Sequence, residues 1–146
     1  MNSYKSSVQG QMTMYTETYL PKVETYRSAG GHNGKMEIGE DHRGDITIVE
    51  IKGRIDISSA SSLGERLTAL IKAGRNRVLV DLKDLAYINS AGLRALLIAG
   101  RLAVESKGAL VLCSLSNEVH RLFDLGAFTD LFQIYSSREE GFAKLS

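Results

Sequence analysis

The chain has 146 residues, of which 43% are hydrophobic and 24% are charged, values that are ordinary for one folded domain. The formal net charge of +1 gives no electrostatic reason to expect direct nucleic-acid binding or a strongly anionic membrane partner. The single cysteine, Cys113, excludes an internal disulfide and fits a cytoplasmic location. We expect neither a membrane span nor a cleaved secretory signal, because no apolar run approaches the required length.

The first 35 residues differ in composition from the rest. They contain the only proline, Pro21, with many Ser, Thr and Gln residues and few aliphatic ones. The glycine-rich segment 30–34 is typical of a flexible linker. We therefore predict a flexible or weakly structured N-terminal extension over residues 1–35 and a folded domain over residues 36–146. The extension is either a mobile tail or an arm that binds a partner, and the weak alternation at 12–15 would fit an added edge strand.

From residue 36 onward the hydrophobic pattern is regular. Residues 46–51 alternate in polarity and are β-branched, which predicts a strand, with residues 36–38 as its short hairpin partner. Gly53–Asp56 is expected to be a turn.

The next segment predicts a helix and a buried strand. Ser58 or Ser59 can cap the helix, and Gly74 ends it. Residues 77–82 are nearly all apolar, which predicts a central strand. The helix has its apolar positions at helical spacing: Leu63, Leu67, Leu70 and Ile71.

A strand–turn–helix pattern follows. Residues 89–92, Asn-Ser-Ala-Gly, open an apolar helix that is expected to be heavily buried and to end at Lys107–Gly108. Residues 109–113 then predict a third main strand.

The C-terminal part predicts two shorter helices around a last strand. One helix runs from Ser116 to Gly126, residues 132–135 form the strand, and Ser137 and Glu140 form a capping box for the final helix. Alternating strands and helices indicate an α/β fold. We expect a mixed, mostly parallel sheet of four to five strands with about four helices packed on it.

The familiar catalytic and cofactor motifs are missing from the sequence. It has no glycine-rich dinucleotide or phosphate loop and no Gly-x-Ser-x-Gly elbow. The three histidines have no metal-ligand spacing, and Cys113 closes an apolar strand, where a buried inert thiol is expected. We therefore expect no enzyme activity, no cofactor and no metal.

Ser90 is the candidate functional residue, because it stands at the predicted start of a helix. It is either a helix cap or an acceptor for a phosphate, which the helix dipole favours at this end. A phosphate there would accept hydrogen bonds from the amides of Ala91, Gly92 and Leu93, and Gly92 would keep the corner sterically open. Since no general base is visible that could make Ser90 a nucleophile, another protein would have to modify it.

Two segments carry a resemblance to a known family. Residues 81–93, Asp-Leu-Lys-Asp-Leu-Ala-Tyr-Ile-Asn-Ser-Ala-Gly-Leu, resemble the signature of the STAS domain of bacterial anti-sigma factor antagonists. Residues 53–56, Gly-Arg-Ile-Asp, resemble that family's Gly-x-Leu-Asp turn. The order of predicted strands and helices from 36 to 145 matches as well. The resemblance therefore implies a STAS-like single domain.

The resemblance also implies a mechanism of partner switching. The unphosphorylated form would bind an anti-sigma factor that is a serine kinase, and so release a sigma factor. Phosphorylation of Ser90 would end this binding, and a PP2C-type phosphatase would reverse it. The protein would be a monomer or a weak homodimer. The expected partner-binding residues are Asp56, Ser58, Ser59, Asn89, Ser90, Ala91, Gly92, Leu93 and Arg94.

Several alternatives stay open. Asp56 is either a partner-surface residue or a turn or cap carboxylate. Asn89 stands where many antagonists have Asp, and Arg94 stands where a small residue is common. Asn89 and the N-terminal extension motivate a second hypothesis, a STAS scaffold module that is never phosphorylated, in a stressosome-like or transporter-associated complex. A small enzyme with Ser90 as nucleophile is a third.

Overall fold

The computed structural model describes residues 23–27 and 36–146. Its strands are β1 (Val23–Arg27), β2 (Glu37–Arg43), β3 (Ile46–Ile55), β4 (Arg77–Asp81), β5 (Leu85–Ile88), β6 (Ala109–Cys113) and β7 (Ile134–Tyr135). They form one sheet in the order β1-β2-β3-β4-β6-β7, and β5 pairs with β3 beyond the end of β4. The β1–β2 and β2–β3 pairs are antiparallel, whereas the other pairs are parallel.

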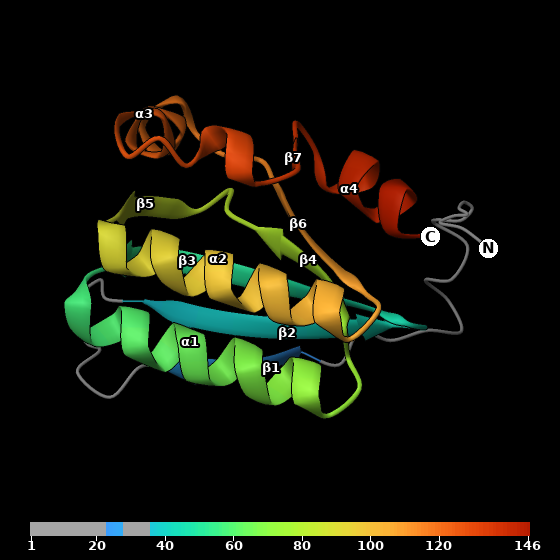
Figure 1. The fold of residues 1–146 in the computed structure, drawn as a ribbon. Helices are drawn as coiled ribbons and strands as arrows, with labels where there is room; N and C mark the ends of the chain where they lie inside the picture. The colour runs from blue at the N-terminus through green and yellow to red at the C-terminus, as the bar shows by residue number, and fades with distance from the viewer. Residues whose placement is uncertain (1–22, 28–35) are drawn as a thin grey trace.

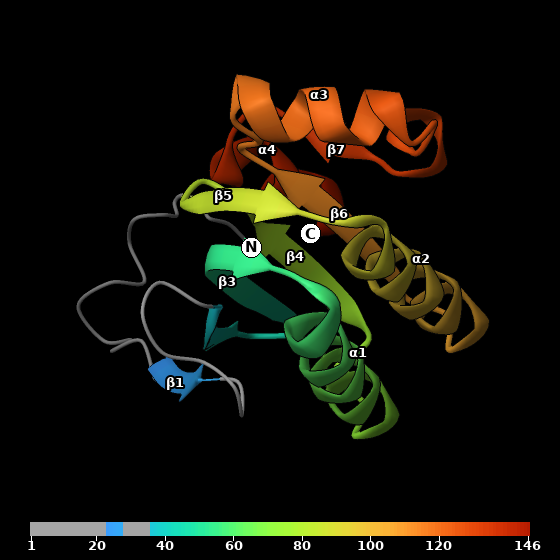
Figure 2. The same cartoon turned by 90° about the vertical axis from the view of Figure 1, so that its left-hand side faces the viewer.

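The helices are α1 (Ile57–Lys72), α2 (Ser90–Glu105), α3 (Asn117–Leu125) and α4 (Arg138–Leu145), with a 3-10 turn at Thr129–Leu131. Helices α1 and α2 lie side by side on one face of the sheet, and α4 packs on the opposite face (Figures 1 and 2). Within the described part of the chain, the fold is therefore a sheet covered on both faces.

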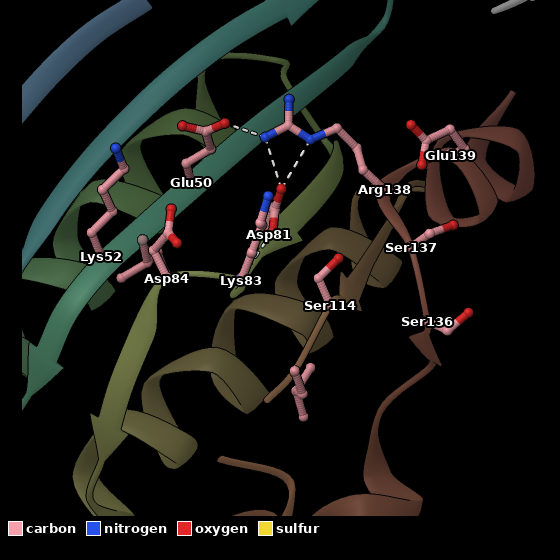
Figure 3. A pocket seen from close by; sticks show the side chains of 12 residues that line it. Glu50, Lys52, Asp81, Lys83, Asp84, Ser114, Ser136, Ser137, Arg138 and Glu139 are labelled. Atoms are coloured by element: carbon pink, nitrogen blue, oxygen red, sulfur yellow. Dashed lines mark hydrogen bonds and ion pairs between the residues drawn. The ribbon is translucent and has the colours of Figure 1, made fainter. Parts of the chain in front are cut away.

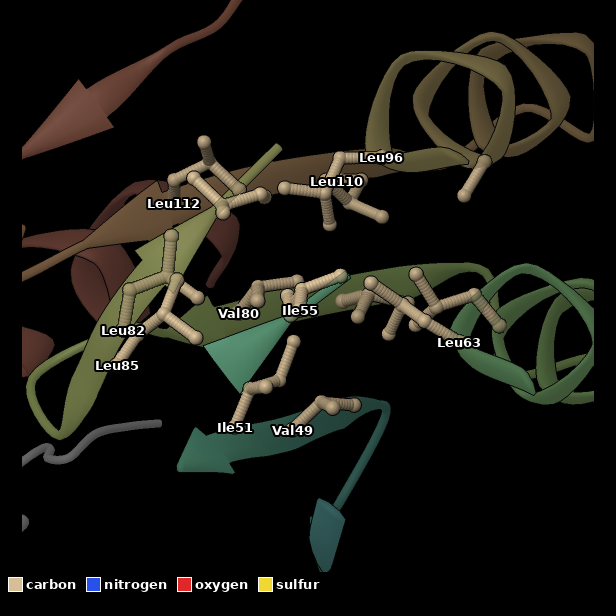
Figure 4. Packing of buried hydrophobic residues seen from close by; sticks show 14 of the residues in the cluster. Val49, Ile51, Ile55, Leu63, Val80, Leu82, Leu85, Leu96, Leu110 and Leu112 are labelled. Atoms are coloured by element: carbon tan, nitrogen blue, oxygen red, sulfur yellow. The ribbon is translucent and has the colours of Figure 1, made fainter. Parts of the chain in front are cut away.

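The core has two parts because successive strand residues point to opposite faces of the sheet. In β4, Val80 joins the larger cluster beneath α1, α2 and α3, and its neighbour Leu79 joins the smaller cluster beneath α4. Leu112 and Val111 divide in the same way in β6. Figure 4 shows the larger cluster, where side chains of the sheet meet Leu96 and other helix residues.

The predicted α/β fold with a mostly parallel sheet is confirmed, and β4 is central as expected, between β3 and β6. The described sheet has more strands than the four to five expected, and the additional strands are β1 and β5. Strand β1 falls within the residues assigned to the N-terminal extension, and the boundary at residue 36 stays a prediction. The edge strand considered at residues 12–15 lies outside the described residues.

The expected turn at residues 53–56 is wrong, because β3 continues to Ile55. Gly53 has a φ of 92° and marks a register shift in the pairing with β5. Its amide donates to the carbonyl oxygen of Asp84 at 3.1 Å. Pairing with β5 thus extends a strand that the sequence pattern ended too early.

Three smaller predictions also need correction. Helix α2 is not buried on all sides, since Ile98 and Val104 are exposed. Strand β7 has two residues instead of four. Ser137 caps α4 as expected, but the carboxylate of Glu140 accepts from the amide of Ser136, so the two do not form a reciprocal capping box.

Candidate functional site

The starts of α1 and α2 are neighbours because the ends of β3 and β5 are paired. Ile55 lies opposite Ile88, and each is followed directly by the residue that caps a helix. The amide of Asn89 donates to the carbonyl oxygen of Ile55 at 3.0 Å. The two segments that carried the family resemblance therefore form one region of the structure.

Asp56 is the N-cap of α1, so the expectation that Ser58 or Ser59 caps this helix is wrong. The Asp56 carboxylate accepts from the amide of Ser59 at 3.1 Å, and the Ser59 hydroxyl accepts from the amide of Asp56 at 2.8 Å. Ser59 is only 1% exposed, whereas Ser58 is exposed and donates its hydroxyl to Asp56. This capping box satisfies the backbone amides of Asp56 and Ser59.

Asn89 is the N-cap of α2, and Ser90 is the first helical residue. The Asn89 side-chain oxygen accepts from the amide of Gly92 at 2.9 Å, and its carbonyl accepts from the amide of Leu93 at 3.0 Å. The capping role left open for Ser90 thus belongs to Asn89. Of the three amides expected to hold a phosphate, those of Gly92 and Leu93 already donate to Asn89, and that of Ala91 has no hydrogen bond among the described residues, so the three-amide site stays a prediction. The exposed Ser90 hydroxyl has no hydrogen-bond partner among the described residues.

Gly92 faces the sheet instead of the open corner predicted for it. It is buried, and a Cβ atom there would lie 2.6 Å from Cγ2 of Ile55 and 2.7 Å from Cγ1 of Ile88. Leu93 beside it is also buried. The glycine therefore lets α2 approach β3 and β5 closely, and it adds no room for a phosphate.

The exposed residues around the two helix starts form a surface that we name the cap surface, defined by Ile57, Ser58, Ser90 and Arg94. Ile57 is 77% exposed, which is unusual for a large aliphatic side chain directly beside two helix caps. Ala91 beside them is half-buried. The cap surface thus combines an apolar side chain, two hydroxyls and one positive charge.

A shallow groove between α1 and α2 lies along the same helices and has a volume of about 450 Å³. Small side chains make it possible, since Gly64 comes close to Ala95 at the contact between the helices. The exposed Ile98 and Glu65 also line this groove. This groove therefore forms an apolar strip along α1 and α2, and the cap surface lies at the starts of the same two helices.

A second concave region lies at the ends of β4 and β6, beside the start of α4, and has a volume of about 630 Å³ (Figure 3). Arg138 donates to Asp81 from two nitrogens, at 2.7 and 2.9 Å, and also to Glu50. Burial lowers the pKa of Arg138, but the hydrogen bonds to Glu50 and Asp81 raise it overall. Because these charged groups satisfy one another, this region fastens α4 to the sheet.

Other potentially reactive groups are inactive or scattered. Burial raises the pKa of Cys113 to about 11, which confirms the expected inert thiol. The described residues contain no cluster of His, Cys, Asp and Glu that could hold a metal ion. None of the helices in the described ranges is long and apolar enough to cross a membrane.

The chain belongs to the STAS domain family, whose model matches residues 38–141. The match includes both segments on which the resemblance rested, and it covers the sheet from β2 to β7 with most of the helices. The class of protein indicated by the sequence is therefore confirmed.

Two relatives of this chain are named anti-sigma factor antagonists. BtrV of Bordetella bronchiseptica, named an anti-sigma factor antagonist, is 34% identical over 71% of this chain and 90% of its own length. The anti-sigma-B factor antagonist of Bacillus subtilis is 34% identical over 64% of this chain and 84% of that protein. A solved anti-sigma factor antagonist from Mycobacterium paratuberculosis has a TM-score of 0.70 at 16% identity, covering 79% of this chain and 97% of that one. The last comparison supports the fold alone.

Proposed function

We propose that this chain is an anti-sigma factor antagonist whose binding is controlled by phosphorylation of Ser90. Its unphosphorylated form binds an anti-sigma factor that is a serine kinase, in the cytoplasm, and so releases a sigma factor. A PP2C-type phosphatase restores the binding form. The observation that carries the proposal is the exposed, unbonded hydroxyl of Ser90 at the start of α2, in a chain whose relatives carry the antagonist name.

The geometry of the cap surface explains why a phosphate on Ser90 would end binding. A phosphoserine carries a charge of about −1.5 to −2 at pH 7. The exposed Ile57 supports an apolar contact at this surface. Burying a phosphate in such a contact leaves a charge without water or a partner, which is costly. The same phosphate in the free protein stays in water at the positive end of α2.

Binding fits the site better than catalysis. A serine nucleophile needs a base within hydrogen-bonding reach, and the Ser90 hydroxyl has no such partner among the described residues. We therefore assign Ser90 the role of substrate for another protein's kinase.

The first prediction concerns Ser90→Asp, which places a negative charge on the cap surface. We expect its affinity for the cognate anti-sigma kinase, measured by calorimetry, to fall at least tenfold, because the charge is desolvated in the complex. Ser90→Ala should bind like the wild type. It should not be phosphorylated when it is incubated with the kinase and ATP.

The matched control is Ser106→Asp, at the other end of the same helix. It should leave affinity unchanged. The proposal fails if Ser90→Ala is still labelled, or if Ser90→Asp binds as tightly as the control. If the wild type binds tightly but is not phosphorylated by the kinase, the result would instead support a scaffold module that is never phosphorylated, the alternative that Asn89 favours.

A further inference from the structure

A phosphate on Ser90 would find few free donors on its own helix. Asn89 already accepts from the amides of Gly92 and Leu93. Among the described residues, this leaves the amides of Ser90 and Ala91 at the start of α2 without a hydrogen bond. A phosphate has three strong acceptor oxygens, so it has capacity for a further charged donor.

Arg94 is placed to be that donor. It lies four residues after Ser90, and residues at this spacing are neighbours on a helix surface, with Cβ atoms about 5–6 Å apart. Both residues are exposed, and Arg94 forms neither a hydrogen bond nor an ion pair within the described part of the chain. An acidic group placed N-terminal to a basic one is also the favourable order for such a pair.

The carboxylates of the neighbouring helix α1 and its cap form no ion pair with Arg94. Asp56, at the start of the neighbouring helix, is engaged in its capping box. Glu65 on α1 lines the groove beside Ala95, and the structure shows no ion pair between Glu65 and Arg94. The guanidinium is therefore available to a group that appears on Ser90.

We propose that Arg94 holds the phosphate on Ser90 through an ion pair along the outer face of α2. This inference rests on the proposed function, because it describes the phosphorylated state of the same site. The pair would neutralise part of the new charge and fix the phosphate against the helix. Arg94 would then stabilise the released, phosphorylated form of the protein.

The test uses full-length protein with phosphoserine installed at position 90 during translation, so that no kinase is required. The second pKa of the phosphate is followed by phosphorus NMR, because a nearby positive charge favours the dianion. We expect the phosphate pKa of the protein that keeps Arg94 to be lower by about 0.3 unit than that of the Arg94→Gln variant. This difference corresponds to the free energy of an exposed i,i+4 ion pair. The difference should vanish in 1 M salt.

Arg101→Gln is the matched control, because this exposed arginine lies two turns beyond Arg94 on the same face of α2. Its phosphate should titrate like that of the wild type. Equal pKa values for wild type and Arg94→Gln would overturn the inference, as would an equal shift in Arg101→Gln. Failure of the cognate kinase to label Ser90 would instead contradict the proposed function and leave this titration unaffected.

Discussion

Gly92 is a residue at which the start of α2 packs directly against β3 and β5. Only glycine fits at this position, because a Cβ atom would lie under 3 Å from both Ile55 and Ile88. A glycine in a helix interior normally costs stability, about 0.5–1 kcal/mol relative to alanine. Here the contact with two strands offsets that cost.

We therefore predict that Gly92→Ala lowers the free energy of unfolding by about 1–3 kcal/mol, since the added methyl overpacks the contact. The measurement is urea denaturation followed by circular dichroism. Gly100, in the same helix, has open space where its Cβ would be, so Gly100→Ala should raise stability by about 0.5–1 kcal/mol. Two changes of the same sign would contradict this account of Gly92.

Cys113 gives a prediction for alkaline pH. Its folded-state pKa is about 11, raised above the ordinary thiol value of 9.0 mainly by burial and then by Asp81. A thiol whose pKa is raised by folding contributes stability below its unfolded pKa and loses it as pH rises through the folded value.

Between pH 9 and 11 the wild type should therefore lose about 2–3 kcal/mol more than Cys113→Val, a difference seen by comparing urea midpoints at each pH. Lysines and tyrosines titrate in both proteins, so only the difference is diagnostic. Parallel pH profiles would show that the thiol is not the responsible group.

At the scale of elements, α4 is held by both apolar contacts and charge. Leu145 packs into the smaller core cluster, and Arg138 connects the helix start to Asp81 and Glu50. Because Asp81 is only 6% exposed, removing its partner would leave a nearly buried carboxylate without a positive charge.

Arg138→Met should therefore lower the free energy of unfolding by about 2 kcal/mol, less than for a fully buried pair because Glu50 and Arg138 are partly exposed. Thermal and urea unfolding at pH 7 would measure it. Glu139→Gln, at the next and exposed position, should change stability by less than about 0.5 kcal/mol. An equal effect of the two substitutions would mean that the ion cluster does not anchor α4.

The sequence predicted the elements with strong periodicity and missed those that depend on distant partners. Strand β4 was found because it is a continuous apolar run, whereas β5 has four residues of mixed exposure and exists because β3 pairs with it. The cap of α1 was misplaced for the same reason. Asp56, Ser58 and Ser59 all have capping side chains, and only the extension of β3 to Ile55 selects Asp56.

For the whole molecule, the candidate site could be located from the sequence but its internal roles could not. The prediction that Ser90 lies at the start of a helix is confirmed. Assigning the N-cap of α2 to Asn89 instead of Ser90 required the hydrogen bonds of Asn89. The two faces of the sheet also differ, since α1 and α2 cover one face (Figure 2) and α4, which Arg138 ties to Asp81 and Glu50, packs on the other.

The hydrogen bond from the Asn89 amide to the Ile55 carbonyl has a mechanical consequence for the proposed switch. It connects the residue before Ser90 to the residue before Asp56, so the starts of the two helices are linked through the paired ends of β3 and β5. In the proposed switch, a displacement of α2 at Ser90 would therefore act on the start of α1, where Ile57 is exposed. A partner resting on α1 alone would thus be sensitive to a chemical event on α2.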